Sequence, residues 1–144
     1  MIRHYDPQDR DALLAVWAES AAVAHPFWTS AMFEQERRDI VNKYLPVAET
    51  YVFECTGAVV GFISLLGNEV GGIFVAPQFH GQGIGRALMD WARGSRDHLE
   101  LEVFEANEIG RTFYAAYGFR VVGKRVDEAT GQPVLRLRLP CNTH

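Results

Sequence analysis

The feature that most restricts the fold is a glycine-rich run at residues 80–85, His-Gly-Gln-Gly-Ile-Gly. It follows an apolar segment at 72–77, which predicts a strand, and it leads into a helical pattern at 84–92. A strand, a glycine turn and a helix start together favour an anion site. Backbone N–H groups can surround phosphate oxygens there, and the helix dipole favours negative charge. The run therefore predicts a phosphate-binding turn.

Spacing excludes two familiar kinds of phosphate loop. A dinucleotide-binding fingerprint needs a third glycine at position 86 or 88, and these positions hold Arg86 and Leu88. A nucleoside-triphosphate loop ends in Gly-Lys-Ser or Gly-Lys-Thr, and neither tripeptide occurs in the chain. The phosphate ligand must therefore be identified from other parts of the sequence.

Bulk composition indicates a single globular domain over residues 1–144, with 48% hydrophobic and 22% charged residues. The sequence contains no apolar stretch of ~20 residues, and its start lacks the apolar core of a secretion signal. Cys55 and Cys141 are too few for a disulfide framework and lack metal-ligand spacing. The net charge of −4 disfavours nucleic acid as a partner. We expect a cytoplasmic protein without a metal ion that binds neither membrane nor nucleic acid.

Hydrophobic periodicity predicts the order β-α-α-β-β-β-α-β-α-β-β, a mixed α/β sheet with helices on its faces. Asp6, Thr29 or Ser30, and Asn107 are expected to cap helices, and Pro46 ends the second helix. The glycine turn falls at the carboxyl end of a predicted strand, where α/β sheets usually bind ligands.

This order, the glycine turn and the segment 107–119 together resemble the GNAT family of acetyl-CoA-dependent N-acetyltransferases, over nearly the whole chain. The first family motif, Gln/Arg-x-x-Gly-x-Gly/Ala, is matched by Gly83 and Gly85, while His80 stands where Gln or Arg is usual. The second, Asn-x-x-Ala-x-x-Phe/Leu-Tyr-x-x-x-Gly-Phe, has Gly110 in place of alanine and is matched at Asn107, Phe113, Tyr114, Gly118 and Phe119.

The resemblance is closest to small bacterial members that acetylate protein lysines or protein N-termini, including those acting on ribosomal proteins. It implies a mostly antiparallel sheet and acetyl-CoA as cosubstrate. The backbone of residues 73–75 would pair with the pantetheine arm, and the amides of residues 82–86 would hold the pyrophosphate. Whether the His80 side chain reaches the pyrophosphate stays open. The residues expected to bind the cofactor are Phe74, Val75, His80, Gly81, Gln82, Gly83, Ile84, Gly85, Arg86, Asn107 and Tyr114.

An amine attacks a thioester only in its neutral form, and the reference pKa of lysine is ~10.4. A proton acceptor, an N–H donor at the carbonyl oxygen and an acid near the sulfur would each assist the reaction. By resemblance, Tyr114 is the candidate acid, although it could instead serve only as a core aromatic. Glu102 and Glu69 are the candidate bases, and solvent alone is the alternative.

The loop with His25, Phe27 and Trp28 is expected to shape the acceptor pocket, as this region does in the family. His25 could relay a proton or simply form a hydrogen bond within the loop. The resemblance implies direct transfer to a primary amine in a ternary complex, with a protein lysine or N-terminus as acceptor. The alternatives are a small-molecule amine (a polyamine, an amino acid or an aminoglycoside) and a non-catalytic acyl-CoA-binding module. A monomer and a homodimer are both compatible with the sequence.

Overall fold

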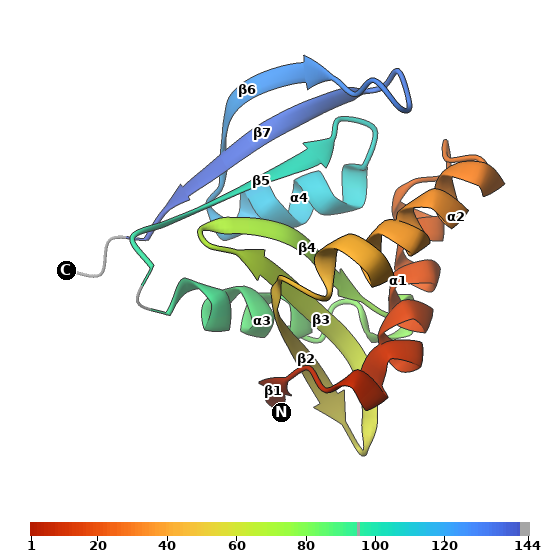
Figure 1. Cartoon of the computed structure of the whole chain (residues 1–144). Coiled ribbons are helices and arrows are strands. Elements are labelled where there is room, and N and C mark those ends of the chain that lie inside the picture. Colours follow the sequence, from red (N-terminus) through yellow and green to blue (C-terminus); the bar gives the residue numbers. More distant parts are fainter. Residues whose placement is uncertain (95, 142–144) are drawn as a thin grey trace.

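One seven-stranded sheet, in the order β1-β2-β3-β4-β5-β7-β6, forms the frame of the molecule. The computed structural model in Figure 1 describes residues 1–94 and 96–141. All neighbouring strands are antiparallel except β4 and β5, which are parallel. The strands are β1 (Ile2–His4), β2 (Glu49–Cys55), β3 (Ala58–Leu66), β4 (Glu69–Val75), β5 (His98–Phe104), β6 (Arg120–Val126) and β7 (Pro133–Pro140).

The helices lie where the sequence predicts them, and the order of elements is confirmed. Asp6 caps the 3-10 turn η1, Thr29 caps α2 and Asn107 caps α4. The predicted second helix is divided, since its last turn before Pro46 is a π-helical segment, η2. No helix in the described part of the chain has the length and apolarity to cross a membrane. The helical segments are η1 (Pro7–Asp9), α1 (Arg10–Ala24), α2 (Ser30–Asp39), η2 (Ile40–Tyr44), η3 (Pro77–Phe79), α3 (Ile84–Arg93) and α4 (Glu108–Tyr117).

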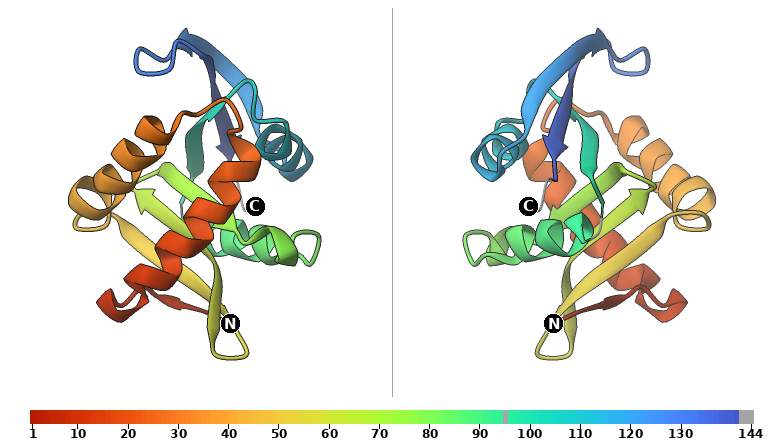
Figure 2. Two further views of the ribbon diagram at one scale, coloured as in Figure 1. Left: turned by 90° about the vertical axis from the view of Figure 1, so that its right-hand side faces the viewer. Right: turned by 90° about the vertical axis from the view of Figure 1, so that its left-hand side faces the viewer.

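Two hydrophobic clusters fix the helices on opposite faces of the sheet. On one face, Leu13 and Trp17 of α1 pack with Val52 and Phe62 of β2 and β3. Figure 2 shows α1 crossing the strands diagonally on this face. On the other face, α3 buries Leu88 completely in a cluster that also contains side chains of α4, β5 and β7. Because α1 and α3 are fixed in this way, the loop that follows α1 and the glycine turn that precedes α3 have defined positions relative to the sheet.

The parallel pair β4 and β5 separates soon after it begins. Its only register pair joins Glu69, the first residue of β4, with Glu100, the third residue of β5. Beyond this pair the two strands diverge, as Figure 1 shows. The edge of β4 that faces β5 therefore lacks a strand partner over most of its length, and this opening is where the predicted site lies.

Candidate active site

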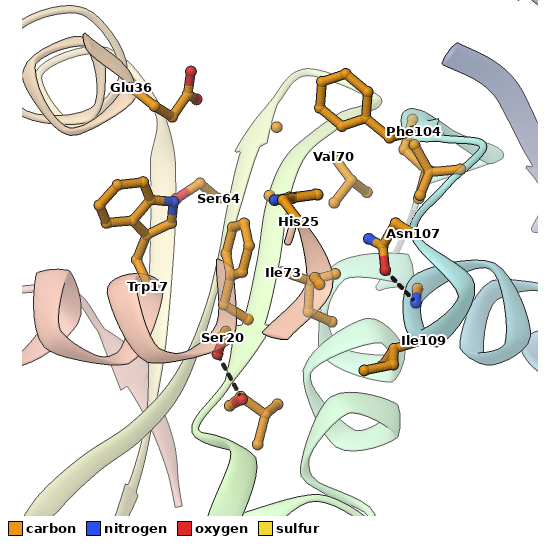
Figure 3. A pocket seen from close by; sticks show the side chains of 18 of the residues that line it. Trp17, Ser20, His25, Glu36, Ser64, Val70, Ile73, Phe104, Asn107 and Ile109 are labelled. Carbon is orange, nitrogen blue, oxygen red and sulfur yellow. Dashed lines mark hydrogen bonds between the residues drawn. The ribbon is translucent and has the colours of Figure 1, made fainter. Parts of the chain in front are cut away.

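A cavity of about 1160 Å³ occupies the opening between β4 and β5. Its wall is built from β4, the glycine turn, the end of β5 and the start of α4, with α1, α2 and the β6–β7 connection on the other side. Figure 3 shows side chains from several of these elements around it. Since one end contains the glycine turn and the other an aromatic loop, the cavity joins the two regions that the sequence predicts to be functional.

The glycine turn presents open backbone to this cavity. Gly81 and Gly83 have φ values of +79° and +83°, which favour glycine, and a Cβ added at either would meet nothing within 4 Å. Gly83 is the N-cap of α3, and no side chain caps this helix. The first amides of α3 are therefore available to an anion, and the turn fits the pyrophosphate of coenzyme A.

The open edge of β4 is partly fixed by two side chains. The Val75 carbonyl accepts a hydrogen bond from Ser20 Oγ at 2.7 Å and from His80 Nε2 at 2.8 Å. The Ser20 contact spans 55 residues, and no local sequence pattern predicts it. Because alternate residues of a strand direct their polar groups to the same edge, Ile73 presents its N–H and C=O beside that carbonyl. This edge suits the amides of a pantetheine arm, whereas the His80 ring is bonded to the protein's own backbone.

Most of the predicted pyrophosphate segment lines the cavity. Gly81 and Gly83 to Arg86 belong to the lining, but Gln82 does not. The Arg86 guanidinium lies over the ring of Tyr117, 5.5 Å from its centroid, in cation–π geometry. The stacked arrangement keeps a positive charge at the first turn of α3.

Asn107 is held firmly at the start of α4. Its side chain accepts a hydrogen bond from the Gly110 amide at 2.9 Å, and the residue is only 8% exposed. A Cβ at position 110 would lie 2.6 Å from Asn107 Nδ2. Glycine in place of the family's alanine at position 110 therefore leaves room for this orientation of the Asn107 side chain.

Tyr114 both packs and lines the cavity, so the two interpretations of this residue do not exclude each other. Its ring meets those of Phe113 and Phe119 edge-on, at centroid distances of 5.5 and 5.6 Å. It is also part of the cavity wall. Burial raises the pKa of the Tyr114 hydroxyl well above its ordinary value, so the group stays protonated at neutral pH. A protonated hydroxyl at this place can donate a hydrogen bond or a proton.

The two candidate bases have different surroundings. Arg136 donates to both carboxylate oxygens of Glu69, at 2.8 and 2.5 Å, and Glu69 does not contribute to the cavity lining. Glu102 does line the cavity, and Arg125 donates to both of its oxygens. This guanidinium keeps the pKa of Glu102 below its ordinary value. The structure therefore brings Glu102, but not Glu69, to the cavity.

The loop between α1 and α2 forms an aromatic cluster with the end of β5. His25 stacks on Trp28 at 4.3 Å, and its ring edge meets Phe27 and Phe104 at 5.7 and 5.3 Å. His25 and Trp28 line the cavity, whereas Phe27 does not belong to the lining and packs against His25 and Phe104. Burial lowers the pKa of His25 to about 4, so the ring is neutral at pH 7. Neither His25 Nδ1 nor Trp28 Nε1, both buried, has a hydrogen-bond partner in the described structure.

Sequence reasoning did not single out Glu36, which also lines the cavity. Burial, and then the charges of Asp39 and Asp127, raise its pKa. Its four-residue spacing from Met32 and Ile40, which line the same cavity, was the available signal. Among the described residues, no group of three His, Cys, Asp or Glu side chains could hold a metal ion.

Comparison with known proteins agrees with this geometry. The sequence model described as an acetyltransferase (GNAT) domain matches residues 46–121. The chain is 33% identical over 141 residues to the peptidyl-lysine N-acetyltransferase YiaC of Escherichia coli strain K12, with 97% of each chain covered. It is 32% identical over 139 residues to the peptidyl-lysine N-acetyltransferase YjaB of the same strain, with 96% of this chain and 94% of YjaB covered.

Solved structures show the same fold. The solution structure of apo YjaB from Escherichia coli matches with a TM-score of 0.83 and 31% identity, covering 96% of this chain and 95% of that one. The PaiA N-acetyltransferase of Thermoplasma acidophilum, solved in complex with coenzyme A, has a TM-score of 0.71 at 19% identity, covering 94% and 96%. The sequence match, the splayed strands and the glycine turn agree, and the chain belongs to the GNAT family as an acetyl-CoA-dependent N-acetyltransferase.

Proposed function

We propose that the amine acceptor of this enzyme is the side chain of a lysine in a protein. The observation that carries the proposal is the single cavity that runs from the glycine turn to the aromatic loop of His25 and Trp28. One end suits a cosubstrate with a pyrophosphate, and the aromatic end suits the long apolar stem of a lysine. The names of YiaC and YjaB support the same acceptor class.

In this proposal the backbone of the chain binds the cosubstrate. Acetyl-CoA supplies an activated acetyl thioester. The amides of Gly83 and the first turn of α3 hold its pyrophosphate, with Arg86 adding positive charge. The polar groups of Ile73 on the open edge of β4 pair with the pantetheine amides, and the N–H of Val75 lies on the same edge. Phe74, whose backbone pairs with Phe62 of β3, contributes to the cavity wall instead. His80 positions the turn through the Val75 carbonyl rather than by contact with phosphate.

Two side chains move protons. A lysine ammonium, with a pKa of ~10.4, must lose a proton before its nitrogen can form the new C–N bond. We assign this proton to Glu102 through an intervening water, because Glu102 lines the cavity and remains ionised. Once the C–N bond has formed, the nitrogen loses a second proton, which passes through the same water to solvent. As the C–S bond breaks, Tyr114 donates its proton to the sulfur and is reprotonated from solvent. Glu69 contributes an ion pair with Arg136 instead.

The proposal also covers the cellular compartment and the oligomeric state of the enzyme. Cys55 and Cys141 are both free thiols, which is usual for proteins of the reducing cytoplasm. We propose that the enzyme acts there, as a monomer or a homodimer. Gel filtration coupled to light scattering would distinguish the two forms.

The acceptor class is tested by following thiol release from acetyl-CoA with three substrates. The first is a peptide with a blocked N-terminus and one lysine, the second has a free N-terminus and no lysine, and the third is spermidine. We expect sustained turnover with the lysine peptide and acetylation of its ε-nitrogen by mass spectrometry. Turnover confined to either of the other substrates would refute the lysine assignment, while calorimetry with coenzyme A tests cosubstrate binding independently.

A further inference from the structure

Three carboxylates stand around the end of the cavity that faces α2. Glu36 and Asp39 come from α2 itself, and Asp127 comes from the β6–β7 connection. Glu36 is half-buried, and in the described part of the chain its carboxylate has neither a hydrogen bond nor an ion pair. A carboxylate that is partly removed from water without a partner is costly, so this arrangement favours a ligand with positive charge.

Neighbouring cations do not neutralise this end of the cavity. Lys43 lies 3.4 Å from Asp39, and Arg125 is engaged with Glu102 and lies 3.8 Å from Asp127. With Glu102 included, four carboxylates therefore face the two cations Lys43 and Arg125. This leaves an excess of two negative charges. Burial together with Asp39 and Asp127 raises the pKa of Glu36, as expected for a carboxylate among like charges. The excess charge complements a cationic ligand.

Unpaired buried nitrogens in the same wall independently indicate a ligand. His25 is 7% exposed and lines the cavity, and its Nδ1 has no partner. Trp28 Nε1, in the ring stacked on His25, is also buried without one. Buried polar atoms are nearly always hydrogen-bonded, so two unpaired nitrogens in adjacent rings are an unmet demand that a ligand can satisfy. Both atoms are closed off from the cavity in this conformation, so a ligand reaches them when the stacked rings turn. A peptide backbone carries both donors and acceptors for such atoms.

The position of Glu36 separates it from the place of acetyl transfer. Figure 3 shows Glu36 and Asn107 on opposite sides of the pocket. Asn107 and Tyr114 belong to α4, the side on which the proposed function places the sulfur. The nitrogen that attacks must be neutral there, whereas Glu36 favours a group that keeps its charge. Glu36 therefore suits a part of the acceptor other than the reacting amine.

We propose that Glu36, together with Asp39 and Asp127, binds a second positive charge of the acceptor. The enzyme would then select lysines that have another cationic side chain close by in the same protein. This inference rests on the proposed function and deepens it, because it specifies which lysines are acetylated. His25 and Trp28 would contact the polypeptide between the two cationic residues.

The test compares two peptides that differ by one charge. Each has a blocked N-terminus and a single lysine, followed two residues later by arginine in one peptide and by its neutral isostere citrulline in the other. We expect the wild-type enzyme to favour the arginine peptide in kcat/KM by about fivefold, the upper range for a partly exposed ion pair. Glu36→Gln should abolish this preference, and Glu36→Lys should reverse it.

Glu34→Gln is the matched control, because Glu34 lies on the same helix but is exposed and does not line the cavity. It should retain the preference for arginine, and all variants should bind coenzyme A as the wild type does. A preference that survives Glu36→Gln, or falls equally in Glu34→Gln, would overturn the inference. Equal turnover of both peptides by the wild type would overturn it too but leave lysine acetylation standing, whereas turnover of neither peptide would reject the proposed function itself.

Discussion

Arg125 on β6 donates to both carboxylate oxygens of Glu102 on β5, at 2.7 and 3.0 Å. The two strands are not neighbours, because β7 lies between them in the sheet. The guanidinium therefore reaches across one strand and holds the carboxylate in a fixed orientation at the cavity wall. It also lowers the pKa of Glu102, so this group is ionised at physiological pH before it accepts a proton.

The first prediction concerns Glu102→Gln. If Glu102 accepts the proton of the acceptor, this change should lower kcat with a lysine peptide by about 100-fold, the usual scale for a lost general base. Affinity for coenzyme A, measured by calorimetry, should not change. Because the pKa of Glu102 is below its ordinary range, the rise of kcat/KM with pH from about 6 to 9 should follow the acceptor amine alone.

Glu69→Gln provides the control for this prediction. It also breaks an ion pair with an arginine, but its site lies outside the cavity lining. We expect its kcat to remain close to that of the wild type. An equal fall of kcat in both variants would show that the ion pairs only maintain the sheet, and the proton would then pass to solvent.

The second prediction concerns Tyr114→Phe, which removes the hydroxyl and keeps the ring packed on Phe113 and Phe119. We expect kcat to fall by about 100-fold, with little change in melting temperature or coenzyme A affinity. Because the pKa of Tyr114 is raised, the wild-type rate should not decline on the alkaline side before about pH 10. Tyr117→Phe, which removes a hydroxyl bonded to Asp90, is the matched control and should leave kcat unchanged.

Features that depend on residues close together in the sequence could be predicted, whereas contacts between residues far apart in the sequence could not. The glycine turn, the caps at Thr29 and Asn107, and the order of strands and helices follow from local patterns, and the structure confirms them. The Ser20 contact with Val75 and the ion pair of Glu69 with Arg136 span 55 and 67 residues. They depend on strand register and helix placement, which periodicity does not specify.

The candidate bases illustrate the same limit. By their positions relative to the two family motifs, Glu69 and Glu102 are equally acceptable as bases. In the structure, however, the residues of β4 that line the cavity come after Glu69, so Glu69 lies outside it. Glu36 is the reverse case, because it lines the cavity although the sequence analysis did not identify it. A polar residue on a mostly polar helix is usually solvated, so its spacing from Met32 and Ile40 becomes informative only once the β6–β7 connection is placed beside it.

The third prediction concerns the N-cap of α4. Asn107→Ala removes the acceptor of the Gly110 amide and should lower the free energy of unfolding by about 1 kcal/mol. Asn107→Asp keeps an oxygen in the same place and should retain the stability of the wild type. Denaturant titration followed by circular dichroism measures both. If the two substitutions destabilise equally, the buried side-chain amide group, rather than the cap, is what the fold requires.

The last prediction concerns the acid stability of the aromatic cluster. Burial lowers the pKa of His25 to about 4, whereas an unfolded histidine has a pKa of about 6.5. Between these two values the unfolded chain binds the proton and the folded chain does not. Stability must therefore fall as the pH falls through this window, by up to roughly 3 kcal/mol.

His25→Phe keeps an aromatic ring on Trp28 and removes the titrating group, so the loss of stability between about pH 6.5 and 4.5 should become shallower. His4→Gln removes an exposed histidine and should keep the wild-type slope. Thermal unfolding followed at a series of pH values distinguishes the variants. Equal slopes for His25→Phe and the wild type would mean that His25 is protonated within the cluster, and its Nδ1 would then have to find an acceptor there.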